Sequence, residues 1–115
     1  MKALRVNAEG TVVVSVSGLL KRGRDTVELF SELREDLSEK PAKLIMDLSE
    51  VRVVDSMSLG LLVGLYLRCQ ELDVQFHFVG VSPEVRKLFE ATNLDKVFTA
   101  QVKQSDGPGQ GGVGA

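Results

Sequence analysis

The distribution of apolar and polar positions predicts a β-hairpin at the start of the chain. Apolar residues at positions 4 and 6 precede a turn at residues 8–10, which contains a glycine, and residues 11–17 form a valine-rich run. Short runs of this kind on either side of a tight turn are typical of two paired strands. We therefore expect the chain to open with two adjacent strands.

A helix is predicted next, because apolar residues recur at a helical spacing with charged residues between them. The expected inward face is formed by Val27, Phe30, Leu33 and Leu37. Asp25 and Glu28 have the spacing of a helix N-cap and its reciprocal acidic partner. The helix should end at Lys40 and Pro41, since a proline disfavours helical backbone in the residue before it.

The rest of the chain alternates strand and helix patterns. Residues 43–47 and 51–54 read as a buried strand, and the continuous apolar run at 43–47 favours a strand that is covered on both faces. A helical pattern resumes after a joint at residues 54–58. Residues 74–78 then alternate between apolar and polar, which indicates another strand.

A third helix should begin at Ser82, because Pro83 is placed at the first helical position. Asn93 can adopt the left-handed conformation that closes this helix, and a short strand is expected around residues 96–99. This order of elements predicts an α/β domain with a mixed, largely parallel sheet of four to five strands and crossover helices.

Composition narrows the class of protein. The 115 residues suffice for one domain, which we expect at residues 1–100, with residues 101–115 as a flexible glycine-rich tail. A net charge of -2 offers no basic field to attract nucleic acid, and no uncharged stretch is long enough for membrane insertion. The first residues lack the apolar core of a secretion signal, so a cytoplasmic location is expected.

No arrangement for catalysis or metal binding stands out in the sequence. His77 is the one histidine, and its place in a strand pattern leaves any serine without a convincing base. Asp47 and Asp55 are more typical of turn caps than of a metal pair, because no phosphate-binding glycine loop lies nearby. Cys69 has the position of a small buried side chain. We expect no enzyme, no metal and no cofactor.

The joint between the third strand and the second helix carries two serines, Ser56 and Ser58. Either hydroxyl can serve as a plain helix N-cap. The joint can also accept a phosphate, because the free N–H groups and the dipole at a helix start tolerate negative charge. A partner docked over the same turn would meet new volume and, next to Asp55, new repulsion. Phosphorylation would then end binding without unfolding the protein.

A small basic cluster, formed by Lys21, Arg22 and Arg24, precedes the first helix. Such a cluster is most often a solvated loop. Its alternative role is contact with an acidic or phosphorylated group on a partner.

The stretch from Asp47 to Gly60 reads Asp-Leu-Ser-x-Val-x-Val-Val-Asp-Ser-Met-Ser-Leu-Gly and resembles the signature of STAS domains, the anti-sigma factor antagonists. Residues 79–89 resemble the third-helix segment of that family, and the resemblance extends over about residues 2–100. It implies the STAS-like fold. The match at the strand-to-helix joint is its specific part.

The resemblance also implies a function. In that family the serine after the aspartate is phosphorylated by a partner that is both anti-sigma factor and serine kinase, and a metal-dependent phosphatase reverses the reaction. The matching residue is Ser56, with Ser58 as the second choice. The expected partner-binding residues are Asp55, Ser56, Met57, Ser58, Lys21 and Arg22. The unphosphorylated form would bind the anti-sigma factor and free the sigma factor.

Two departures from the family pattern leave an alternative open. Met57 and Ser58 stand where a small hydroxyl residue and a glycine are usual. The usual Gly-Glu-Leu-Asp after the second strand is Gly-Leu-Leu-Lys here, at residues 18–21, so both acidic positions are lost. The alternative is a STAS-like accessory subunit that binds the ATPase of a membrane lipid transporter. The sequence does not indicate an oligomeric state.

Overall fold

The centre of the molecule is a mixed sheet of four strands in the order β1-β2-β3-β4. The computed structural model describes residues 1–98. The strands are β1 (Lys2–Ala8), β2 (Thr11–Leu20), β3 (Lys43–Val54) and β4 (Gln75–Val81). The β1 and β2 strands pair antiparallel, as the hairpin pattern predicts, whereas β2 with β3 and β3 with β4 are parallel. The predicted fold class is therefore confirmed.

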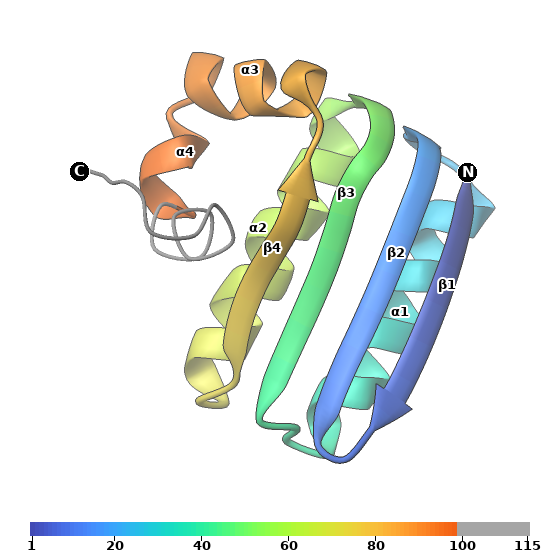
Figure 1. Ribbon diagram of the computed structural model, residues 1–115, viewed down its shortest axis with the longest axis vertical. Coiled ribbons are helices and arrows are strands. Elements are labelled where there is room, and N and C mark those ends of the chain that lie inside the picture. Colours follow the sequence, from blue (N-terminus) through green and yellow to red (C-terminus); the bar gives the residue numbers. More distant parts are fainter. Residues whose placement is uncertain (99–115) are drawn as a thin grey trace.

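The helices of the described chain are α1 (Arg24–Ser38), α2 (Ser56–Glu71), α3 (Pro83–Ala91) and α4 (Leu94–Val97). Helices α1 and α2 lie on the same side of the sheet, while α3 and α4 cover the end at which β3 and β4 finish (Figure 1). Among residues 1–98, no helix combines the length and apolar character needed to cross a membrane.

The core lies between the sheet and α1 with α2. Val14 is in register with Met46, and Met46 with Phe78, and all three side chains are fully buried in this layer. Leu33 of α1 and Leu65 of α2 are also fully buried. Burial of such apolar side chains is the dominant favourable contribution to folding.

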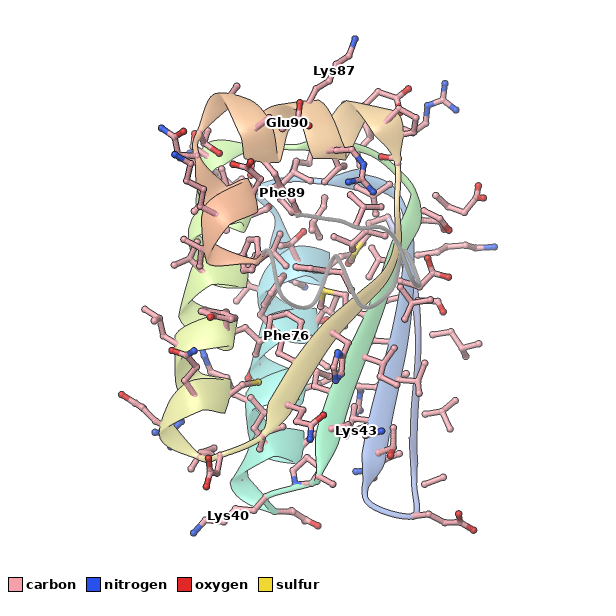
Figure 2. All side chains as sticks on the ribbon, turned by 60° about the vertical axis from the view of Figure 1, so that its left-hand side comes forward. Lys40, Lys43, Phe76, Lys87, Phe89 and Glu90 are labelled. Atoms are coloured by element: carbon pink, nitrogen blue, oxygen red, sulfur yellow. The ribbon has the colours of Figure 1, made fainter. Side chains whose placement is uncertain are left out.

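The opposite face of the sheet is open in the described part of the chain. Val13 and Ile45 share a row on this face, and Ile45 is only partly buried while Val13 is 36% exposed. Figure 2 shows side chains projecting from this face with no helix over them. The prediction that residues 43–47 are covered on both faces is therefore wrong. Both crossover helices pack on one side, so the apolar run is buried only at alternate positions.

Helix α1 begins differently from the prediction. Its N-cap is Gly23, no side chain caps it, and Asp25 lies in the first turn. Thr26 is buried and donates its hydroxyl hydrogen to the carbonyl oxygen of Lys21 at 2.6 Å, whereas Val27 is 53% exposed. The helix thus turns Thr26 toward the core in place of Val27, while Phe30, Leu33 and Leu37 are buried as predicted.

The chain after α3 forms a short helix and not the predicted strand. Asn93 has φ 62° and closes α3 in the left-handed conformation, as expected. The backbone then turns into α4, and Phe98 enters the core with no exposed surface. Phe98 lies against the rings of Tyr66, Phe78 and Phe89, so burial of its ring favours a compact turn over an added strand. The remainder of the expected strand and the tail at 101–115 lie outside the described residues.

Candidate partner-docking site

The site is centred on Asp55, which joins the end of β3 to the start of α2. Asp55 is the N-cap of α2, and its Oδ1 accepts a hydrogen bond from the N–H of Ser58 at 2.9 Å. Its Oδ2 accepts a second bond from the N–H of Arg22 at 2.7 Å. The cap is therefore the aspartate and neither serine. One carboxylate fixes both the helix start and the loop between β2 and α1.

These hydrogen bonds keep the carboxylate charged. The N–H of Arg22, followed by that of Ser58, holds the pKa of Asp55 below its ordinary value of 3.8. Hydrogen bonds to the charged form of a carboxylate favour that form. A full negative charge is therefore present next to Ser56 at neutral pH.

The two serines of the joint are in different environments. Ser56 is the first residue of α2 and is exposed. Ser58 has no exposed surface. Met57 between them is half-buried. Of the two hydroxyls, the Ser56 hydroxyl is the one that an approaching enzyme can reach.

The basic loop, residues 21–24, lies against this joint. The N–H of Asp55 donates to the carbonyl oxygen of Leu20 at 3.1 Å, in addition to the bond between Arg22 and the Asp55 carboxylate. Lys21, Arg22 and Arg24 are exposed. The structure thus brings together the residues predicted for partner binding, although the loop and the joint are far apart in the sequence.

Sequence reasoning did not identify two exposed apolar residues that lie next to the joint. Leu19 and Val53 are register partners at the ends of β2 and β3, and they are 41% and 49% exposed. Residues 51–54 read as a buried run, but register shifts in β2 and β3 turn Val53 outward. The adjacent leucines at 19 and 20 could have indicated an exposed leucine. Neighbouring strand residues point to opposite faces, so the two cannot both face the core.

The other candidate residues, His77 and Asp47, lie on the strands β4 and β3. His77 is half-buried on the open face of the sheet, where its Nε2 lies 3.0 Å from Oε1 of Gln75. Asp47 accepts a hydrogen bond from the N–H of Ser49 within strand β3, so it does not cap a turn. No group of three or more histidine, cysteine, aspartate or glutamate side chains is placed to hold a metal in this part of the chain.

The described chain is thus a small α/β domain in which a four-stranded mixed sheet carries both crossover helices on one face and a serine-bearing joint begins α2. The STAS domain family model matches residues 5–106, and the chain belongs to this family. A STAS-domain containing protein of Pseudomonas aeruginosa is 29% identical over 69 residues, which cover 60% of this chain and 68% of that protein.

Solved structures of antagonists are similar as well. An anti-sigma factor antagonist from Mycobacterium paratuberculosis is 30% identical, with a TM-score of 0.67 over 84% of this chain and 81% of the other. The anti-sigma factor antagonist SpoIIAA of Bacillus, in its unphosphorylated form, is 18% identical, with a TM-score of 0.72 over 83% of this chain and 84% of the other. The second of these shows likeness of fold.

Proposed function

We propose that this protein is an anti-sigma factor antagonist, a non-enzymatic binding protein controlled by phosphorylation of Ser56. When Ser56 carries no phosphate, the protein binds an anti-sigma factor that is also a serine kinase, and the sigma factor is released. A metal-dependent phosphatase restores the binding form. The protein would act in the cytoplasm, where these partners meet. The observation that carries the proposal is the exposed Ser56 at a helix start beside the charged Asp55.

The position of Ser56 allows modification without unfolding. A phosphate adds about -1.5 to -2 charges at neutral pH. At the first residue of α2 that charge meets the free N–H groups and the positive end of the helix dipole, which stabilise anions. The neighbouring Asp55 carboxylate opposes the phosphate, but its own hydrogen bonds to Arg22 and Ser58 remain available.

The same phosphate would weaken the binding of a partner docked over the joint. An interface over the joint must exclude water, and a phosphate placed in it brings both volume and an uncompensated charge. Asp55 and the phosphate together would also repel any carboxylate of the partner close to α2. Loss of binding with retention of the fold is the behaviour expected of a switch.

Ser56 is favoured over Ser58 as the acceptor because of exposure. A kinase must place the hydroxyl next to the γ-phosphate of ATP, which a side chain with no exposed surface cannot reach without local unfolding. Ser58 has no exposed surface, whereas Ser56 is exposed.

The test is binding of the serine kinase from the same organism to purified variants. Ser56→Asp should weaken kinase binding by about tenfold or more, because it places a charge in the interface. Ser56→Ala should bind like the wild type and accept no phosphate. The melting temperature of both should stay close to that of the wild type. Mass spectrometry after incubation with kinase and ATP locates the phosphate.

Ser31→Asp is the matched control, because Ser31 is an exposed helical serine on α1. It should change neither binding nor phosphorylation. Equal kinase binding by the wild type and Ser56→Asp, with no phosphate on Ser56, would contradict the proposal. Recovery of a transporter ATPase with unmodified protein would favour the accessory-subunit alternative, which Met57 in place of a small hydroxyl residue supports.

A further inference from the structure

The basic loop carries positive charges that form no ion pair within the described residues, 1–98. Salt bridges among the described residues include those of Arg5 with Glu32 and Asp36, and of Arg68 with Glu71. Lys21, Arg22 and Arg24 take part in none of them within residues 1–98, and all three are exposed. Exposed cations that form no ion pair within residues 1–98 are available to a carboxylate from another molecule.

A hollow lies at the same place. It has a volume of about 210 Å³, and its lining combines the three cations with Leu19, Met1 and the first-turn carboxylate of Asp25. Leu19 extends this surface to its register partner Val53, which is 49% exposed. The lining of the hollow therefore combines apolar side chains with mainly positive charge.

We propose that this hollow and the Leu19–Val53 pair bind an acidic segment of the partner protein that carries at least one apolar anchor. The inference rests on the proposed function, because it assumes that the same joint is the docking face. It goes further by stating the sign of the charge on the partner's segment. An apolar anchor in a hollow is the usual centre of a binding hot spot, and arginine pairs with carboxylates in a bidentate geometry. Charge complementarity selects a segment rich in aspartate or glutamate.

The loop also lies close enough to the joint to respond to phosphate on Ser56. The Arg22 backbone is bonded to the carboxylate of Asp55, the residue before Ser56. A phosphate on Ser56 therefore enters the field of the same cations and competes with the partner's carboxylates for them. Phosphorylation then removes the attraction as well as adding repulsion.

The test uses short fluorescein-labelled peptides and fluorescence anisotropy. One peptide alternates leucine with glutamate, a second alternates leucine with lysine, and a labelled single-stranded DNA serves as a polyanion without apolar anchors. The leucine–glutamate peptide should bind the wild type at least about tenfold more tightly than either other probe, and this preference should decrease at high salt.

Two variants of the loop test whether its positive charges cause the preference for the leucine–glutamate peptide. Lys21→Gln with Arg22→Gln should weaken binding of the leucine–glutamate peptide by about tenfold, and Lys21→Glu with Arg22→Glu should reverse the order of the two peptides. Ser56→Asp should also weaken binding of the leucine–glutamate peptide. The matched control is Lys40→Glu with Lys43→Glu, which makes the same change of charge at the far end of the molecule (Figure 2). The control should bind like the wild type.

The outcomes separate this inference from the proposed function. Equal binding of both peptides to the wild type, an unchanged affinity in the loop variants, or tighter binding of the DNA would overturn the inference. None of these results bears on whether a kinase phosphorylates Ser56. Conversely, charge-dependent peptide binding without phosphorylation of Ser56 would leave the inference standing and remove the proposed switch.

Discussion

At the scale of single residues, the geometry of the joint depends on Asp55. Its two oxygens hold two segments, the start of α2 and the loop before α1, through the N–H groups of Ser58 and Arg22. This arrangement frees both serines from capping. Ser56 can point to solvent, and Ser58 packs inward.

We predict that the stability supplied by Asp55 depends on pH. The folded-state pKa is lowered, so the contribution is present above the ordinary pKa of 3.8 and is lost as the pH falls through the lower folded value. Asp55→Ala should therefore lower the melting temperature at neutral pH, and the difference from the wild type should disappear in strong acid. Thermal unfolding followed by circular dichroism across this range measures it.

Asp25→Ala provides the control for this prediction. Asp25 is an exposed carboxylate in the first turn of α1 and caps no helix by a side-chain hydrogen bond. Its replacement should change the melting temperature much less. A difference between Asp55→Ala and the wild type that persists in strong acid would show that the carboxylate charge is not the cause.

At the scale of elements, sequence patterns predicted most of the joint but not its details. The Asp55–Ser58 stretch was recognisable because an apolar strand changes there to a helical spacing. The identity of the cap was not, because aspartate and serine are both good N-caps and only the bond from Arg22 makes Asp55 the anchor. The outward turn of Val53 depends on register shifts between paired strands, which a single sequence does not reveal.

Helix α4 is a short element whose type could not be predicted from the sequence pattern. Residues 96–98 have no periodicity long enough to separate strand from helix. The deciding contact is tertiary: the Phe98 ring lies 5.0 Å from that of Phe78 and 5.4 Å from that of Tyr66 between centroids. Burial of one aromatic ring in a cluster outweighs weak local preferences.

We predict that Phe98→Ala lowers the free energy of unfolding by about 3–5 kcal/mol, because it removes a fully buried aromatic side chain and leaves a cavity. Urea denaturation measures the change. Val97→Ala is the control, since Val97 is 38% exposed and precedes Phe98 in the chain. A loss for Phe98→Ala no larger than that for the control would mean that α4 is not anchored by this ring.

At the scale of the whole molecule, both crossover helices pack on the same side of the sheet. The sequence predicted the alternation of strands and helices and hence the fold class, but it did not show on which side each helix packs. The continuous apolar run at 43–47 suggested cover on both faces for that reason. The single core that results includes Cys69, which has no exposed surface.

We predict that the Cys69 thiol is unreactive in the folded protein. Burial raises its pKa to about 12, and a buried neutral thiol is a poor nucleophile. Alkylation by iodoacetamide at neutral pH should proceed no faster than the protein opens, and it should accelerate to the rate of a free thiol in urea. Rapid labelling of the native protein would indicate that α2 separates locally from β4.

The sign of the charge at residues 21–24 has a consequence for cells that contain several proteins of this fold. Domains with the same backbone and the same serine joint risk engaging each other's regulators. A positive loop in one and a negative loop in another would penalise mismatched complexes by like-charge contact. Separate signalling circuits can then be kept insulated by a few surface side chains, while the scaffold that transmits each signal stays the same.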